Sequence, residues 1–345
     1  MRLRTLAPAL AFGVVLAMAV PASAKTTPSW RLVPTGSSQQ FRGLAAVSSS
    51  VAWLAGTSGT VLRTVDGGRH WSDVSPPGAS ALQFRDIEAW DGRNAVALTI
   101  GTGTDARVYR TADGGQSWQL AFTNDDPNAF YDRMAFFNKR DGLAVSDPVD
   151  GKFRLIATRD GGRTWSLVDP AGMPAALPGE FGFAASGTCL ITSGHQAWIA
   201  SGGGAVPRVF HSRDFGRTWT VADTPVVAGP TAGIYALTAW GARHVVAVGG
   251  DFTAPTAHVD IAASSTDGGQ SWQLAAAMPG GYRSGVAFAG PHTVVAVGPT
   301  GSDISTDGGR TWTTFDTGYF DTVQRGRDGT VWASGTGGRV AVLAG

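Results

Sequence analysis

Cysteine is nearly absent from this chain of 345 residues, in which Cys189 is the single copy. One cysteine cannot form an internal disulfide, so the fold depends on the burial of apolar side chains. Hydrophobic residues make up 43% of the sequence, which is enough for a sizeable core. The 48 glycines and 12 tryptophans suggest many tight turns and large packing residues, as in an all-β protein.

A surplus of charge of either sign is also lacking. Lys and Arg number 27 and Asp and Glu number 26, which leaves a formal net charge of +1. Glutamate occurs only as Glu88 and Glu180, and arginine supplies nearly all of the positive charge. This balance gives no indication of a nucleic-acid partner or an anionic membrane.

Common signatures of catalysis are missing. The sequence has no Gly-x-Ser-x-Gly motif and no paired histidines at metal-ligand spacing, since its six histidines stand singly. The glycine run 202–204 lies between predicted strands, whereas a nucleotide site needs a glycine run between a strand and a helix. We therefore expect no cofactor and no bound metal.

The N-terminal residues have the pattern of an export signal. Arg2 and Arg4 precede an apolar run at 6–20, and small residues at 22–24 suit a signal peptidase. The run is short for a membrane span, which needs about 20 apolar residues. We expect residues 1–24 to be cleaved near Ala24. Residues 25–345 then form one exported domain (secreted, periplasmic or in the cell envelope) without stable membrane insertion.

A nine-residue phrase occurs six times, first at 63–71, where it reads Arg-Thr-Val-Asp-Gly-Gly-Arg-His-Trp. Its Asp and Gly residues suit a tight turn, because Asp accepts hydrogen bonds from backbone N–H groups and Gly adopts positive φ. The tryptophan can fill the gap between neighbouring sheets. We therefore assign a structural role to the Asp and Trp of each copy: Asp66 and Trp71, Asp113 and Trp118, Asp160 and Trp165, Asp214 and Trp219, Asp267 and Trp272, and Asp307 and Trp312.

The spacing of the phrase predicts a repeat of four strands. Successive Asp residues lie 47, 47, 54, 53 and 40 positions apart, close to the roughly 40–50 residues of one propeller blade. In the first unit, β-prone runs cover 41–47, 51–56, 60–65 and 70–75, and the phrase lies between the third and fourth runs.

The two ends of the chain complete one unit together. Three β-prone runs follow the last phrase, at 320–325, 329–334 and 338–343, and a blade of three strands would leave an open edge. Residues 29–32 resemble the fourth strand at 117–120. We predict an all-β, seven-bladed β-propeller with four antiparallel strands per blade, closed by the N-terminal strand joining the last blade. Six or eight blades would leave this match unexplained.

The phrase resembles the Asp-box, or BNR repeat, in its pattern Ser/Thr-x-Asp-Gly-Gly-x-Thr/Ser-Trp, as at 305–312. Proteins with this box include sialidases, photosystem II assembly factors of the Ycf48 type and bacterial WD40/YVTN/BNR-like repeat proteins. The repeat spacing is most similar to that of the last two groups. The resemblance implies a propeller, but these families share no single activity.

Strand direction places the phrases on one face and the irregular loops, at 124–128, 146–151, 169–179 and 202–207, on the other. Loops that depart from a repeat are where a scaffold usually carries function. The starts of the first strands should surround the channel mouth on that face, where an aromatic residue recurs beside Arg or Asp. They supply the candidate binding residues Arg42, Arg85, Asp86, Tyr131, Asp132, Arg133, Tyr282 and Arg283.

Two explanations of these residues stay open. The aromatic residues can be packing residues, with each Arg paired to a nearby Asp. Alternatively, Arg42, Arg85, Arg133 and Arg283 form a ring that grips carboxylates or phosphates.

A second set on the same face consists of Asp132, Asp147, Asp150 and Glu180, the candidate catalytic residues of an enzyme. Two carboxylates about 5 to 9 Å apart can hydrolyse glycosides, although such groups can equally hold a metal ion or pair with Arg133 and Lys152. A sialidase would normally show Phe-Arg-Ile-Pro before its first box, whereas this chain has Phe-Arg-Gly-Leu at 41–44.

The sequence therefore favours an exported, non-catalytic, monomeric propeller that binds a protein or peptide partner through its loops. The alternative is a glycan-processing hydrolase that uses the same face.

Overall fold

The computed structural model of the chain describes Met1 and residues 27–344. The predicted export signal and its cleavage point near Ala24 lie outside the described residues, apart from Met1. The described residues form 28 strands and four short 3₁₀ helices. None of their helices is long and apolar enough to cross a membrane.

The strands associate into antiparallel groups of four, in the order of the chain. The first group is β2 (Phe41–Ala46), β3 (Ala52–Gly56), β4 (Val61–Thr64) and β5 (Ser72–Asp73). The second is β6 (Gln83–Ala89), β7 (Ala95–Thr102), β8 (Arg107–Thr111) and β9 (Gln119–Thr123), with η1 (Gly103–Asp105) in the loop after β7. The third is β10 (Phe130–Phe136), β11 (Gly142–Val149), β12 (Lys152–Thr158) and β13 (Ser166–Leu167).

The next groups follow the same plan after η2 (Pro170–Gly172) and η3 (Gly187–Cys189). They are β14 (Leu190–Ser193), β15 (Gln196–Ala200), β16 (Arg208–Ser212) and β17 (Thr220–Asp223); β18 (Ala232–Trp240), β19 (His244–Asp251), β20 (Ala262–Ser265) and β21 (Gln273–Leu274); and β22 (Gly285–Phe288), β23 (Val294–Gly298), β24 (Gly301–Ser305) and β25 (Thr313–Asp316).

The remaining strands come from both ends of the chain. β26 (Thr322–Arg325), β27 (Val331–Ser334) and β28 (Val340–Ala344), with η4 (Thr336–Gly338) before β28, form a sheet with β1 (Ser29–Leu32) at its outer edge. In this sheet Trp30 lies opposite Leu343. The N-terminal strand therefore pairs where the similarity between residues 29–32 and a fourth strand predicts.

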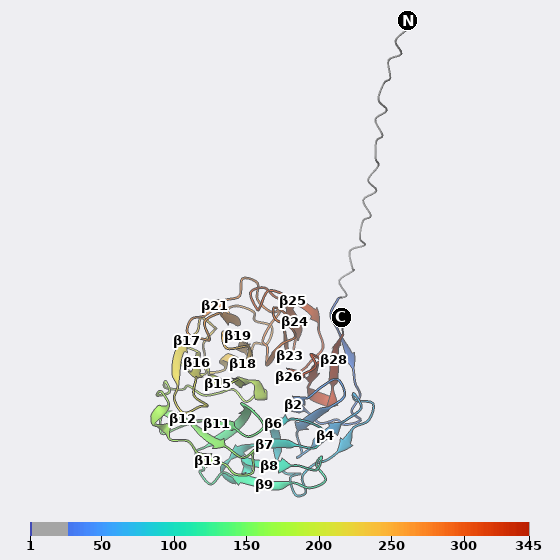
Figure 1. Cartoon of the computed structure of the whole chain (residues 1–345). Helices are drawn as coiled ribbons and strands as arrows, with labels where there is room; N and C mark the ends of the chain where they lie inside the picture. The colour runs from blue at the N-terminus through green and yellow to red at the C-terminus, as the bar shows by residue number, and fades with distance from the viewer. Residues whose placement is uncertain (2–26, 345) are drawn as a thin grey trace.

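The sheets lie around a common axis, as Figure 1 shows. The first strand of each group contacts the first strand of the next, from β2 through β6, β10, β14, β18 and β22 to β26, and β26 contacts β2 in turn. The second and third groups are also joined into one eight-stranded sheet, because β10 pairs with the end of β7 at Tyr131 and Gly101.

The repeated phrase forms the turn between the third and fourth strands. In the first copy, Asp66 Oδ1 accepts hydrogen bonds from the Thr64 hydroxyl at 2.9 Å and from the His70 N–H at 3.0 Å. The Thr64 hydroxyl oxygen in turn accepts the Gly68 N–H at 2.9 Å. Gly67 and Gly68 have φ of 74° and 80°, which an L side chain rarely adopts. Each copy thus supplies its turn with its own acceptors.

The tryptophan of the phrase packs between neighbouring sheets. Trp118 meets Trp53 of the preceding group edge-on, with ring centroids 6.4 Å apart, and its indole N–H donates to Val74 O at 2.7 Å. Trp71 meets Trp332 in the same way at 6.3 Å. Because each such contact joins two groups, the phrase both closes a turn and holds adjacent sheets together.

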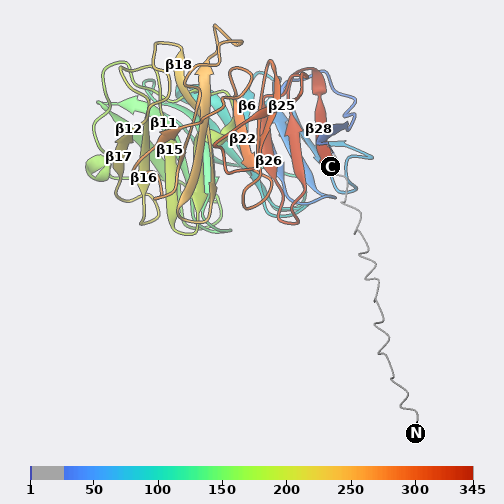
Figure 2. The ribbon, with the colours of Figure 1, turned by 90° about the horizontal axis from the view of Figure 1, so that it is seen from above.

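The two faces of the molecule carry different connections. Turns between first and second strands meet the phrases on one face, where the Gly114 N–H donates to Arg93 O at 2.8 Å and the Gly161 N–H to Arg140 O at 2.9 Å. The other face, here called the loop face, carries the second-to-third loops and the connections between groups. The side view in Figure 2 shows a loop that projects on the β18 side beyond the sheets.

One boundary expected from the sequence was wrong. The loop predicted at 146–151 is mostly strand, since β11 continues to Val149 and only Asp150 and Gly151 turn, with φ of 53° and 76°. An Asp-Gly pair with two positive φ angles makes a tight two-residue hairpin, which needs no longer loop.

Candidate functional site

The aromatic residues at the starts of the first strands are buried. Tyr131 packs edge-on against Phe122 at a centroid distance of 5.8 Å, and Phe84 against Tyr109 at 5.7 Å. All five rings are buried in the core: Phe41, Phe84, Tyr131, Tyr282 and Phe320. Their packing between sheets accounts for the recurrence of an aromatic residue at this position.

The four arginines that the sequence suggests as a ring differ in their exposure to solvent. Arg42 keeps 27% of its side chain exposed, whereas Arg85, Arg133 and Arg283 are buried. Arg283 donates through Nε to Asp303 Oδ2 at 2.5 Å and through Nη1 to the Thr300 hydroxyl at 2.7 Å. A guanidinium group held inside the protein in this way is not free for a ligand. Arg42 is the one of these four that reaches solvent.

A segment of the connection between β13 and β14 closes the central axis. We call residues 180–189 the plug segment. The η3 helix at its end contacts β2, β6, β10, β15 and β18, and the Ser186 hydroxyl donates to Ser284 O at 2.7 Å. The Gly182 N–H donates to Asp147 Oδ1 at 2.8 Å, and Arg85 Nη1 donates to Ala184 O. The loop face therefore has a closed centre.

Asp132 and Arg133 lie under the plug segment as a fully buried pair, with Arg133 Nη1 3.1 Å from Asp132 Oδ2. Arg133 Nη2 lies 3.8 Å from Asp147 Oδ1, and Nη1 lies 3.4 Å from Cys189 Sγ. Burial raises the pKa of Asp132 to about 7, although Arg133 opposes the shift. A Cβ on Gly182 would lie 1.9 Å from the Arg133 guanidinium, so a larger residue there would displace that group.

Asp86 lies close to the other end of the plug segment. Its Oδ1 accepts the Ile87 N–H at 2.9 Å and its Oδ2 accepts the Met134 N–H at 2.7 Å. Burial raises the pKa of Asp86 to about 7, although these two hydrogen bonds oppose the shift. A Cβ on Gly187 would lie 2.3 Å from Asp86 Oδ1. The carboxyl group thus joins two first strands and lies against Gly187 of the plug segment.

The other candidate catalytic carboxylates lie apart. Glu180 is buried against Arg208, whose Nε donates to Glu180 Oε1 at 2.9 Å, and it also accepts the Ser201 hydroxyl at 2.6 Å. Asp150 has 93% of its side chain exposed on its hairpin turn and lies 3.8 Å from Arg154. Asp132, Asp147 and Glu180 each lie against an arginine.

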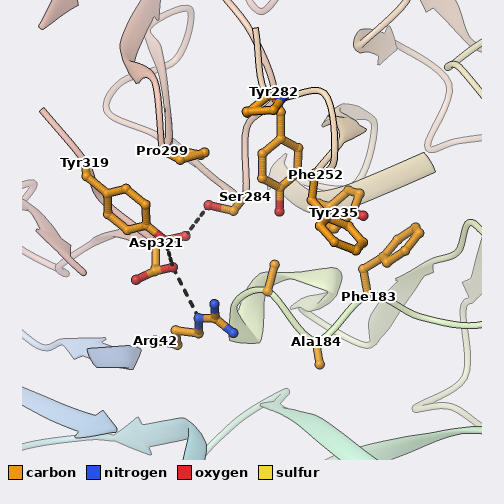
Figure 3. Close-up of a pocket in the computed structure, with 12 residues that line it drawn as sticks. Arg42, Phe183, Ala184, Tyr235, Phe252, Tyr282, Ser284, Pro299, Tyr319 and Asp321 are labelled. Carbon is orange, nitrogen blue, oxygen red and sulfur yellow. Dashed lines mark hydrogen bonds and ion pairs between the residues drawn. The ribbon is translucent and has the colours of Figure 1, made fainter. Parts of the chain in front are cut away.

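A cavity of about 420 Å³ opens on the loop face beside the plug segment. Arg42 and Asp321 lie on one side of it, and Phe183, Tyr235 and Tyr282 on the other, as Figure 3 shows. Residues of the first, fifth and sixth groups and of three connections between groups line it: Arg42, Phe183, Ala184, Ala185, Tyr235, Phe252, Pro255, Tyr282, Ser284, Pro299, Tyr319 and Asp321. The cavity is lined mostly by apolar and aromatic groups, with a few polar groups, as ligand sites usually are.

A charged pair bounds the cavity on one side. Arg42 Nε donates to Asp321 Oδ1 at 3.2 Å, and the same carboxylate accepts Gln40 Nε2 at 2.9 Å and the Tyr319 hydroxyl at 3.1 Å. Burial raises the pKa of Asp321, although Arg42 opposes the shift. Since protein donors surround Asp321, its main effect on the cavity is to fix the orientation of Arg42.

Aromatic rings form the opposite wall. Phe183 of the plug segment stacks on Tyr235, with centroids 3.9 Å apart and 12° between the ring planes. Tyr282 meets Tyr235 edge-on at 4.6 Å. Phe252, in the loop after β19, has 52% of its surface exposed. Phe183, Tyr235, Phe252 and Tyr319 are absent from the candidate residues of the sequence, which included Arg42 and Tyr282.

No group of three or more His, Cys, Asp or Glu residues is placed to hold a metal ion in the part of the chain that the structure describes.

The chain matches no protein-family model and no curated protein. Solved structures do resemble it. "YCF48 bound to D1 peptide" is 14% identical, with a TM-score of 0.65 over 96% of this chain and 99% of that chain. YCF48 from Cyanidioschyzon merolae is 15% identical, with a TM-score of 0.60 over 91% and 98%. A streptogramin B lyase is 11% identical, with a TM-score of 0.62 over 94% and 99%.

These likenesses establish the fold and no more. WD40 propellers also match, among them that of Doa1, at 11% identity and a TM-score of 0.58 over 91% of this chain and 97% of that chain. A lyase and WD40 repeat domains thus share the architecture. The chain has a β-propeller fold, on which function depends on the individual site.

Proposed function

We propose that the protein is an exported, non-catalytic propeller that binds a peptide segment of a protein partner on its loop face. The cavity beside Arg42 carries this proposal, because it combines an aromatic wall with an exposed guanidinium group. Aromatic residues and arginine are the side chains most enriched at binding hot spots. The neighbour described as YCF48 bound to a D1 peptide shows that a propeller of this shape can hold a peptide.

The proposed architecture is a ring of seven blades. The contacts between successive first strands, and the pairing of β1 with β28, support a ring closed by the N-terminal strand. On this account the six phrases are Asp-boxes with a structural role, and residues 25–345 are one domain that acts as a monomer. Cleavage of residues 1–24 near Ala24 would release it as an exported protein.

Photo-crosslinking tests which face binds the partner. Phe252 on the loop face and Trp240 on the phrase face are both large exposed aromatic residues, 52% and 36% exposed. A photoreactive phenylalanine derivative is placed at either position, and the protein is irradiated with the exported fraction of its native host. We expect one defined protein adduct from position 252 and none from position 240. Adducts from position 240 alone, or from neither, would contradict the proposal.

A further inference from the structure

The cavity beside Arg42 has an apolar side that is already assembled. Phe183 and Tyr235 are buried and stacked, and Tyr282 holds Tyr235 from its edge. Phe252 and Pro255 belong to the projecting loop after β19 and complete the wall. A rigid aromatic wall binds a bulky apolar side chain at low cost in conformational entropy.

Tyr282 adds one polar group to this wall. It is only 6% exposed, yet its hydroxyl makes no hydrogen bond among the described residues. Figure 3 shows that hydroxyl pointing into the cavity. By contrast, the Tyr235 hydroxyl donates to Thr231 O at 2.7 Å, and the Tyr319 hydroxyl to Asp321 at 3.1 Å. A hydroxyl that faces the cavity without a protein partner is available to bond a ligand atom there.

Arg42 adds two further donors. Its Nε is held by Asp321 at 3.2 Å, and its two terminal nitrogens make no hydrogen bond within the described residues. The guanidinium group lies at the edge of the cavity in Figure 3. Two terminal nitrogens of one guanidinium fit the two oxygens of a carboxylate, and this geometry is specific for that group.

We propose that the cavity is a specificity pocket, which takes one bulky apolar side chain of a bound peptide while Arg42 pairs with an adjacent carboxylate. The Tyr282 hydroxyl then bonds a polar atom of the peptide beside that side chain. A volume of about 420 Å³ lies at the small end of the range of about 300–1,000 Å³ typical of ligand pockets, as expected for one or two residues. The carboxylate is either an Asp or Glu side chain or the C-terminus of the peptide.

The inference rests on the proposed function and is tested with two random peptide libraries displayed on phage. In one library both ends of the peptide are joined to coat protein, and in the other the C-terminus is free. We expect selected peptides to carry Phe, Tyr, Trp, Leu or Met beside a carboxylate. Enrichment in the first library identifies an Asp or Glu side chain, and enrichment in the second alone identifies a free C-terminus.

The affinities of one selected peptide for the wild type and for variants test whether the peptide binds in this pocket. By fluorescence anisotropy we expect Arg42→Gln and Tyr282→Phe each to weaken binding about tenfold, since each removes hydrogen bonds to the ligand. Replacing the bulky residue of the peptide by Ala should weaken it at least tenfold. Arg325→Gln is the matched control, because Arg325 stacks on Trp240 on the phrase face. Circular dichroism checks that each variant is folded.

Failure of the pocket proposal can be distinguished from failure of the proposed peptide binding. Selected peptides that lack the motif, or that bind both pocket variants as tightly as the wild type, would overturn the pocket and leave peptide binding elsewhere on the loop face. Selection of no peptide from either library would overturn the pocket and the proposed function together.

Discussion

Phe183 and Tyr235 stack with centroids 3.9 Å apart although 52 positions separate them in the chain. One ring belongs to the plug segment and the other to β18. This stacking makes the plug segment part of the wall of the cavity. The same irregular connection therefore both closes the central axis and shapes the candidate site.

Replacement of Phe183 should affect stability and binding together. Phe183→Ala removes a buried ring and leaves a cavity, which should lower the free energy of unfolding by about 3 kcal/mol. Chemical denaturation measures this change, and anisotropy with a selected peptide should show weaker binding. Phe252→Ala is the control for stability, because that ring is half exposed, and it should change stability by about 0.5 kcal/mol or less. Equal stability of both variants would contradict the assigned packing.

The contribution of the N-terminal strand can be measured with two substitutions in β1. The Trp30 indole N–H donates to the Ser302 hydroxyl at 2.9 Å, and its ring lies 5.2 Å from that of Phe320. Trp30→Ala should therefore destabilise the protein by about 2–3 kcal/mol. Leu32→Ala on the same strand should cost about 0.5 kcal/mol or less, since Leu32 is 52% exposed. If Trp30→Ala is equally mild, the strand does not close the ring.

Asp86 gives a prediction about pH. Its pKa in the folded protein is raised to about 7, whereas an unfolded Asp titrates near about 3.9. Between these values the folded state keeps a proton that the unfolded state has lost, so the contribution of Asp86 to stability falls as pH rises from about 4 to 7. Asp86→Asn cannot titrate. The difference in unfolding free energy, wild type minus variant, should therefore decline over this range, and a constant or rising difference would contradict the assignment.

Substitution of Glu180 distinguishes a structural role of this residue from a catalytic one. Its buried pair with Arg208 predicts that Glu180→Gln destabilises the protein by about 3–5 kcal/mol, because Arg208 loses its charged partner. Asp150→Asn is a matched control on an exposed turn and should have almost no effect. Denaturant titration measures both. Hydrolysis of sialosides or other glycosides by the wild type, abolished in a Glu180→Gln variant of unchanged stability, would favour the hydrolase instead.

The repeat made much of the architecture predictable. Asp, Gly and Trp recur at fixed positions because each turn needs an acceptor, a residue with positive φ and a ring between sheets, as at Asp66, Gly68 and Trp71. The residues that meet these requirements lie within nine positions of one another, so the pattern can be recognised in the sequence. The match of Trp30 to a fourth strand likewise predicted a strand that pairs with β28, 313 residues away in the register Trp30–Leu343.

The candidate site was predictable only in part. Arg42 and Tyr282 were identified because the sequence pattern places an aromatic residue beside Arg near the start of each of these first strands. The plug segment could not be foreseen, since it belongs to no repeat and its place depends on tertiary contacts such as that of Gly182 with Arg133. Gly182 and Gly187 were the available signals, but a glycine in an irregular connection does not show which side chain approaches it.

The most direct test of loop-face binding compares two arginines on opposite faces. The partner found by crosslinking at position 252 is titrated calorimetrically into the wild type, Arg42→Gln and Arg325→Gln. Loss of the paired guanidinium should weaken binding at least tenfold in Arg42→Gln, with Arg325→Gln unchanged. Unchanged affinity in Arg42→Gln, or a loss confined to Arg325→Gln, would contradict binding at the loop face beside Arg42.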